Sequence, residues 1–202
     1  MKFNIKRIDT PKQLSDVQRL LYDELVIGQR WKVDSQNPIG IKISRNKLTD
    51  NYDSVSNWFA VSSDNNLIGC VRVHGLLNSK HELEHYGKIP VFLKDGSYQI
   101  SRLVIKRGYR YIPTVLPRLI RTLVRFSYVN GIQYLFNAST FPLPGSLYLK
   151  FQMRHCEQRY RFPGSNEDAH LFVADREAME KSIQYSTRLI ERYKKDASPV
   201  MV

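Results

Sequence analysis

QISRLVIKRGYR, residues 99–110, is the segment around which the rest of this chain can be arranged. Apolar side chains alternate along its first half, and this period of two predicts a β-strand over residues 98–105. A glycine flanked by cations follows, and the apolar-periodic segment after it predicts a helix. Ser101 and Arg102 stand side by side in the strand. These two side chains suit either an ordinary strand surface or the edge of an active site.

The segments on both sides of this strand predict further helices and strands. Apolar residues at helical spacing predict a helix over 14–27, and two β-rich runs joined by a polar turn at 63–66 predict a hairpin. Farther along the chain we expect helices over 113–129, 147–156 and 175–195 and strands over 132–138 and 169–174. This order indicates an α/β fold with a mixed sheet.

The composition is that of a globular protein. The chain has 202 residues, of which 42% are hydrophobic and 25% charged, so one domain spanning residues 1–202 with a substantial core is expected and a disordered chain is excluded. No segment approaches the roughly 18 apolar residues of a transmembrane helix, and the N-terminus lacks the apolar core of a signal peptide. Cys70 and Cys156 do not form a Cys-x-x-Cys motif, so we expect free thiols and a cytoplasmic location.

The charge of the chain is strongly positive and unevenly distributed. The formal net charge is +12, which points to a polyanionic partner such as nucleic acid, anionic lipid or an acidic protein. Residues 96–156 contain no Asp or Glu at all. The same window holds nine cations: Arg102, Lys106, Arg107, Arg110, Arg118, Arg121, Arg125, Lys150 and Arg154. One half of the fold therefore presents positive charge without nearby carboxylates.

Three segments carry a resemblance to a known family. IGCVRVHG (68–75), QISRLVI (99–105) and RFSYVNGIQYLFNAST (125–140) resemble matching segments of GNAT-fold acyltransferases, in the branch of LuxI-like acyl-homoserine-lactone synthases and FeeM-like N-acyl amino acid synthases. The hallmark strand of that branch is Glu-x-Ser-Arg, and here it reads Gln-Ile-Ser-Arg. The resemblance covers residues 14–180 and implies a central mixed, twisted β-sheet flanked by helices.

The resemblance also implies roles for particular residues. It assigns Gln99, Ser101 and Arg102 to the catalytic strand, and Trp31, Asp50, Asp53 and Arg72 to binding of the acceptor substrate. It places Arg107, Arg110 and Tyr111 at the phosphate of the acyl donor, and Leu103, Leu135, Phe136 and Phe151 around the acyl chain. An N-terminal lobe of about residues 1–57 would close over the acceptor site. No metal and no tightly bound cofactor are implied.

Two departures from the family pattern matter for the chemistry. Gln99 replaces the family's Glu and cannot act as a base, so the proton acceptor stays open among Asp50, Asp53, Glu82, Glu84, His74, His81 and His85. The loop that follows the strand, Arg-Tyr-Ile-Pro-Thr (110–114), has lost the glycines that let a backbone approach a pyrophosphate. This favours the phosphopantetheine of an acyl carrier protein over free acyl-CoA as the donor. An acidic carrier would be steered by Lys106, Arg118, Arg121 and Lys150, unless the helical arginines are simply a solvated face.

Strand alternation predicts that Ser101 and Arg102 point to opposite faces of the sheet. Arg102 would then share an apolar face with Ile100 and would need a carboxylate partner, because an unpaired buried guanidinium is costly. Asp50 or Asp53 would supply it. Such an ion pair either pins the N-terminal lobe to the sheet or belongs to a substrate site. Trp31 and the apolar residues expected around the acyl chain have two interpretations in the same way: they either pack in the core or form walls of the pocket.

These observations predict an N-acyltransferase that moves a fatty acyl chain from an acyl carrier protein thioester to the amine of an amino acid or related metabolite. A lactone-forming quorum-signal synthase that uses S-adenosylmethionine is the first alternative. A catalytically inert, basic GNAT-like binding module is the second, and Gln99 keeps it open. Nucleic acid is not favoured as a partner, because no nucleic-acid-binding motif is present.

Overall fold

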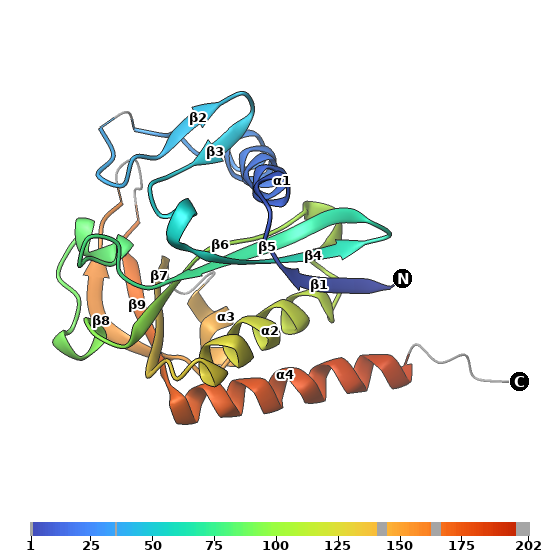
Figure 1. Cartoon of the computed structure of the whole chain (residues 1–202). Helices are drawn as coiled ribbons and strands as arrows, with labels where there is room; N and C mark the ends of the chain where they lie inside the picture. The colour runs from blue at the N-terminus through green and yellow to red at the C-terminus, as the bar shows by residue number, and fades with distance from the viewer. Residues whose placement is uncertain (1, 35, 141–144, 163–166, 197–202) are drawn as a thin grey trace, which may run out of the picture.

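The computed structural model describes residues 2–34, 36–140, 145–162 and 167–196. Its centre is a seven-stranded sheet with the order β1-β4-β5-β6-β7-β9-β8 (Figure 1). The strands are β1 Phe3–Arg7, β4 Asn57–Ser63, β5 Asn66–His74, β6 Ser97–Ile105, β7 Tyr134–Thr140, β8 Arg154–Tyr160 and β9 Ala169–Asp175. All paired neighbours are antiparallel except β6 and β7, which are parallel, so the sheet is mixed as expected.

Helices cover both faces of this sheet. On one face lie α2 Val115–Val129, α3 Gly145–Lys150 and α4 Arg176–Asp196, and on the other lie α1 Pro11–Leu21 and a small hairpin, β2 Lys42–Ser44 and β3 Lys47–Thr49 (Figure 1). The hydroxyl of Thr10 caps α1 by accepting from the Gln13 N–H, and Pro11 occupies the first turn, where its missing N–H costs nothing. A π-helical segment, Tyr22–Gly28, continues α1. No described helix is both long and apolar enough to cross a bilayer.

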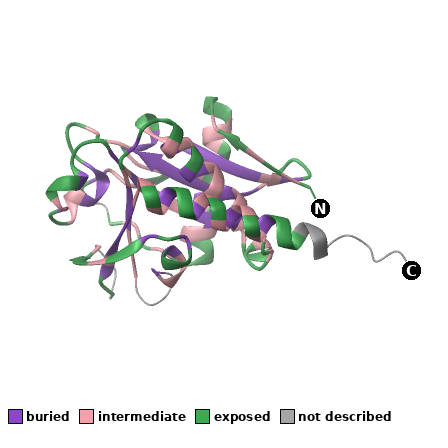
Figure 2. Cartoon of the chain, turned by 90° about the horizontal axis from the view of Figure 1, so that it is seen from below, coloured by how far each residue is buried: buried purple, intermediate pink, exposed green. Residues whose placement is uncertain are grey.

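Two of the three apolar cores among the described residues lie between the sheet and its two helical layers. Below the sheet, α2 buries Val115, Leu119 and Leu123, spaced by one turn, and the inward residues of the central strands pack on them. Above it, Val17 and Leu21 of α1 pack with buried residues of β4 and β5. Figure 2 shows the buried central strands behind α2 and α4, whose outward faces are exposed. The amphipathic pattern of each helix therefore decides which face of the sheet it covers.

The middle of the sheet contains two irregularities. Cys70 lies opposite Val104 and Arg72 opposite Ser101, so two residues of β6 face one of β5, which is a β-bulge. Arg102, inside the bulge, has a φ of 54°, a left-handed conformation that is uncommon for a non-glycine residue. The parallel pairing of β6 with β7 extends only from Ser97–Tyr134 to Gln99–Phe136, although both strands continue beyond it. The carboxyl ends of these two strands therefore separate.

The hairpin, the central strand and the long helices lie where the sequence predicts them, but the predicted helix over 147–156 is wrong in its second half. Helix α3 ends at Lys150, Gln152 turns the chain with a φ of 68°, and β8 begins at Arg154. Strand β8 lies at the edge of the sheet and is mostly exposed, so its sequence lacks apolar alternation. β1 is the opposite edge strand, which the sequence does not predict: only Phe3 and Ile5 alternate in its five residues, too short a pattern to indicate a strand by itself.

Candidate active site

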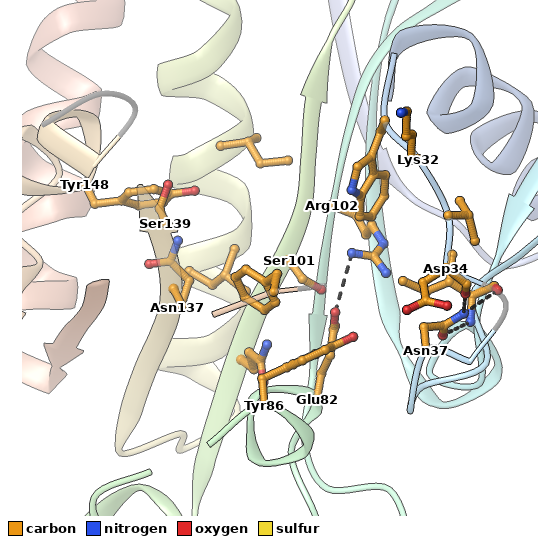
Figure 3. A pocket seen from close by; sticks show the side chains of 18 residues that line it. Lys32, Asp34, Asn37, Glu82, Tyr86, Ser101, Arg102, Asn137, Ser139 and Tyr148 are labelled. Atoms are coloured by element: carbon orange, nitrogen blue, oxygen red, sulfur yellow. Dashed lines mark hydrogen bonds and ion pairs between the residues drawn. The ribbon is translucent and has the colours of Figure 1, made fainter. Parts of the chain in front are cut away.

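A cavity opens where β6 and β7 separate. Its volume is about 280 Å³, and Figure 3 shows polar side chains converging on it. Strand β6 contributes residues 99–103 and β7 contributes residues 137–139, while Trp31, Lys32 and Asp34 come from the N-terminal lobe. Ligands of open α/β sheets commonly bind at the carboxyl ends of strands where neighbours diverge. The cavity is therefore the candidate active site.

Arg72 of β5 is the centre of a buried ionic cluster beside this cavity. Its guanidinium is fully buried; Nη1 lies 2.5 Å from Oδ1 of Asp50 and 3.0 Å from Oδ1 of Asp53, and Nη2 lies 2.5 Å from Oε2 of Glu82. Its Nε donates to the hydroxyl of Ser101 at 2.9 Å. One side chain thus ties the N-terminal lobe, the connection before β6 and the strand itself together.

Arg102 extends the cluster into the cavity. Its Nη2 lies 2.6 Å from Oδ2 of Asp50 and its Nη1 lies 3.4 Å from Oε1 of Glu82, while the guanidinium lies 5.4 Å from the centre of the Trp31 ring. The predicted pairing with Asp50 or Asp53 is confirmed. The prediction that Ser101 and Arg102 point to opposite faces is wrong, because the bulge breaks the alternation and both side chains line the cavity.

The cluster perturbs its three carboxyl groups in different directions. Burial raises the pKa of Asp50, but the guanidiniums of Arg102 and Arg72 outweigh burial and lower it. Burial also raises the pKa of Glu82, but Arg102 and Arg72 outweigh it and hold the pKa well below its usual range. Burial and the neighbouring Asp50 raise the pKa of Asp53, and Arg72 only partly offsets them. Asp50 and Glu82 are therefore carboxylates near neutral pH.

Gln99 has a partner that the sequence did not suggest. Its Oε1 accepts a hydrogen bond from the Leu83 N–H at 2.9 Å, and its side chain is buried against the cavity. Leu83 belongs to a short 3₁₀ helix, Glu82–His85, in the connection between β5 and β6. Gln99 thereby fixes the turn that carries Glu82.

The structure separates the seven candidate proton acceptors. Glu82 is the member of the set that lines the cavity. Asp50 and Asp53 line a different, open groove near α1, and His85 faces another. His74 and His81 are completely buried, and Glu84 caps its own turn by accepting from the His81 N–H. No group of three or more His, Cys, Asp or Glu side chains in the described ranges is arranged to hold a metal ion.

The residues expected at the donor phosphate lie in the turn after β6. Arg107 and Tyr111 are exposed, and Arg110 binds the Ile105 carbonyl through Nε and forms an ion pair with Glu24 of the N-terminal lobe at 2.8 Å. A second feature of this turn reduces its main-chain donors. Pro113 and Pro117, on either side of the start of α2, have no N–H to offer a phosphate. Side-chain cations therefore dominate this turn.

The four residues expected around the acyl chain occupy three places. Leu103 lines the main cavity, and Leu135 and Phe151 line a second, apolar cavity of about 20 Å³ below it. Ile100 and Tyr148 belong to the walls of both cavities, so they separate them. Phe136 does not belong with these residues: it faces the opposite side of β7 from Leu135, with its ring 4.8 Å from that of His81.

A mixed sheet whose parallel central strands part over a polar cavity is the architecture of the GNAT acyltransferases. An acetyltransferase of the GNAT family from Staphylococcus aureus Mu50 aligns with 87% of this chain and 99% of its own, with a TM-score of 0.58 at 10% identity. No protein-family model and no curated protein matches the sequence.

Two other solved structures resemble the chain over more of its length. MesI, described as a CoA-dependent acyl-homoserine lactone synthase, covers 93% of this chain and 95% of its own, with a TM-score of 0.68 at 14% identity. FeeM, an N-acyl amino acid synthase from uncultured soil microbes, covers 93% and 98%, with a TM-score of 0.66 at 9% identity. The chain therefore has the GNAT fold in the form that these two synthases share.

Proposed function

We propose that this chain is an N-acyltransferase that joins a fatty acyl group to the amine of an amino acid or related metabolite. The observation that carries the proposal is the polar cavity at the point where β6 and β7 separate, with the ionic cluster of Arg72 and Arg102 on one side and an apolar cavity on the other. An acyl transfer needs a fixed thioester, donors for its carbonyl oxygen and a bound amine. The polar cavity offers groups that can serve each of these needs.

The separation of β6 and β7 supports an entry path for the donor. Beyond Gln99 the facing edges of the two strands no longer pair with each other, so their main-chain groups can hydrogen-bond an extended pantetheine arm lying between them. The arm would emerge at the turn that carries Lys106, Arg107 and Arg110. The phenol of Tyr148, whose pKa burial raises to about 12, keeps its proton at neutral pH and can donate to the thioester end.

The N-terminal lobe supports the position of the acceptor. Lys32 and Asp34 wall the cavity opposite Ser139 and Tyr148 (Figure 3), and Trp31 lines it as well. The lobe is fastened to the catalytic strand through Asp50 and to the turn after β6 through Glu24. We infer that the lobe, residues 8–57 without the strand β1, covers the acceptor. Asp53 contributes to this fastening through Arg72 rather than to the cavity itself.

The donor we propose is an acyl carrier protein thioester rather than acyl-CoA, with both substrates meeting in the cytoplasm. The prolines of the phosphate turn and the arginines of α2, of which Arg125 is exposed, support it. A carrier protein can be held by its acidic surface instead of by a pyrophosphate cradle. MesI is a CoA-dependent enzyme of the same fold, so acyl-CoA is the donor to test against.

The test is a matched comparison of donors and acceptors. Purified protein is incubated with one acyl chain presented either on acyl carrier protein or on CoA, together with the twenty amino acids or S-adenosylmethionine, and products are identified by mass spectrometry. We expect an N-acyl amino acid, faster turnover with the carrier, and a rate that falls with salt because exposed charges are screened beyond about 8–10 Å at physiological ionic strength.

Each other outcome selects a rival. A lactone formed from S-adenosylmethionine makes the chain a quorum-signal synthase, which is the activity of MesI. Faster, salt-insensitive use of acyl-CoA overturns the carrier proposal alone. Absence of product with every pair leaves the inert, basic binding module. Gln99 is the observation that favours that module.

A further inference from the structure

Glu82 is a carboxylate of the cavity whose Oε2 is bound by Arg72 and whose main-chain turn is fixed on either side. Building on the proposed function, we propose that Glu82 binds the amine of the acceptor and accepts its proton, and that Gln99 positions Glu82 through the Leu83 N–H. The proton acceptor would then be a carboxylate on the connection before β6. The strand β6 itself has only the amide of Gln99 at the position of the family's Glu. Figure 3 shows Glu82 between Arg102 and Tyr86 at the edge of the cavity.

The two oxygens of Glu82 have different neighbours. Oε2 is occupied, at 2.5 Å from Nη2 of Arg72 and 3.4 Å from Nε2 of His74. Oε1 has only a long contact, 3.4 Å to Nη1 of Arg102. A carboxylate oxygen has room for more than one donor. Oε1 is therefore the oxygen that can receive an ammonium group entering from the cavity.

The turn that carries Glu82 is fixed at two main-chain N–H groups, one on either side of Glu82. Gln99 accepts from the Leu83 N–H, and the Glu84 carboxylate accepts from the His81 N–H at 2.8 Å. Both bonds hold main-chain donors that flank Glu82, so the side chain is presented by a rigid 3₁₀ turn. Gln99 is thus a positioning residue, because its amide holds a main-chain group and Glu82 holds the substrate.

The chemical step balances with these groups. An acceptor ammonium releases one proton to water, and its nitrogen lone pair attacks the thioester carbonyl carbon. The C–N bond forms, the C–S bond breaks, and the sulfur leaves as a thiolate. The second proton passes from the nitrogen of the adduct to Glu82 and then, by way of solvent, to the thiolate, so that the products are an amide and a free thiol.

The electrostatics of Glu82 fit this order of events. Burial raises the pKa of Glu82, but Arg102 and Arg72 outweigh it and hold the pKa well below the usual range, so the group is ionised when the acceptor arrives. An ionised carboxylate attracts an ammonium. It takes a proton readily only once attack on the carbonyl has made the nitrogen more acidic.

The primary test compares Glu82→Gln with Glu180→Gln in the donor and acceptor pair that gives product with the wild type. Both substitutions remove one carboxylate, but Glu180 is exposed on α4 and does not line the cavity. We expect Glu82→Gln to lower kcat by about 100-fold or more, the range of general acid–base catalysis, and Glu180→Gln to match the wild type. Equal activity of Glu82→Gln and the wild type overturns the proposal.

A carboxylate swap keeps the test decisive if loss of the Arg72 partner destabilises Glu82→Gln. The double variant Glu82→Gln/Gln99→Glu returns a carboxylate to the cavity and can still accept from the Leu83 N–H. We expect it to be at least about 10-fold faster than Glu82→Gln/Gln99→Ala, a barrier difference of about 1.4 kcal/mol. Equal rates for the two double variants, both folded by circular dichroism, contradict the proposal.

A third comparison isolates the role of the ammonium. Hydroxylamine is unprotonated at neutral pH and needs no carboxylate to hold its charge. The conservative Glu82→Asp variant, which keeps a partner for Arg72, should therefore lose more activity with an amino acid acceptor than with hydroxylamine. A variant that is slow with both acceptors to the same degree contradicts the binding of the ammonium by Glu82. An inactive wild type would instead refute the proposed function and not this assignment.

Discussion

The arginines of this protein occupy two opposite environments. Arg72 and Arg102 lie within the sheet and bind three carboxyl groups, whereas on α2 Arg121 is half-buried and Arg125 is exposed, and no ion pair among the described residues involves either of them. A buried guanidinium that loses its partners leaves charges without solvation, so the first pair specifies the structure of the site. An exposed one stays hydrated, so the second pair can be changed with little effect on folding.

The largest effect is expected from Arg72. Arg72→Met fills a similar volume but leaves Asp50, Asp53 and Glu82 buried with one guanidinium fewer, and should reduce the free energy of unfolding by about 3–5 kcal/mol. Arg125→Met on the exposed face should change it by less than about 0.5 kcal/mol. Urea denaturation measures both. Similar losses from the two variants would remove the distinction between the two environments.

The next largest effects are expected within the buried cluster, where the carboxyl groups of Asp50 and Asp53 should contribute differently to stability. Asp50→Asn should reduce the free energy of unfolding at pH 7 by about 1–3 kcal/mol, because it removes the charged acceptor shared by two arginines. Asp53→Asn should cost less, since burial and Asp50 already disfavour the charged form of Asp53. The double variant serves as a check on their coupling.

The two substitutions should also depend on pH with opposite signs. The lowered pKa of Asp50 means that its ionised form stabilises the fold above the ordinary Asp value of about 3.9 and that this contribution is lost as the pH falls. The raised pKa of Asp53 means that the folded state holds its proton more tightly, so its ionisation reduces stability as the pH rises. Below about pH 5 the penalty for Asp50→Asn should therefore shrink as the pH falls, whereas above about pH 4 the penalty for Asp53→Asn should shrink as the pH rises. Parallel slopes would contradict the assignment.

An intermediate case is the pair between Arg110 and Glu24, which is partly exposed and joins the turn after β6 to the N-terminal lobe. A double-mutant cycle with Arg110→Ala and Glu24→Ala should give a coupling energy of about 0.2–1 kcal/mol, as for other solvated pairs. A value as large as that of the buried cluster would show that this contact belongs with the structural group. Salt should weaken the coupling.

The smallest effect on stability, and a large one on association, is expected on α2. Arg121→Glu/Arg125→Glu should leave the free energy of unfolding within about 0.5 kcal/mol of the wild type, and should weaken binding of acyl carrier protein on the order of 10-fold. Arg188→Glu/Arg192→Glu on α4 changes the net charge equally and is the matched control. If both double variants weaken carrier binding alike, net charge and not a docking face is responsible.

The sequence by itself determined the elements with strong periodicity. The hairpin β4–β5, the strand β6 and the helix α2 each show a regular apolar pattern, and the order of these elements was enough to predict the mixed sheet. The grouping of Arg102 with Asp50 also followed, because a guanidinium on a sheet must find a carboxylate. Apolar periodicity depends only on local sequence, and the cost of a buried unpaired charge applies to any protein. Both can therefore be used to make predictions without coordinates.

Only the tertiary structure decided which carboxylate faces the cavity and which way two neighbouring side chains point. The bulge at Arg102 arises from a register shift against β5, and no residue in the sequence of β6 predicts it. Glu82 reaches the cavity because Gln99 holds the main-chain N–H of the next residue, Leu83, which lies 16 positions before it in the chain. The edge strand β8 depends on its pairing with β9 rather than on an apolar pattern. Each of these features depends on contacts between distant segments, and such contacts form only when the whole sheet has assembled.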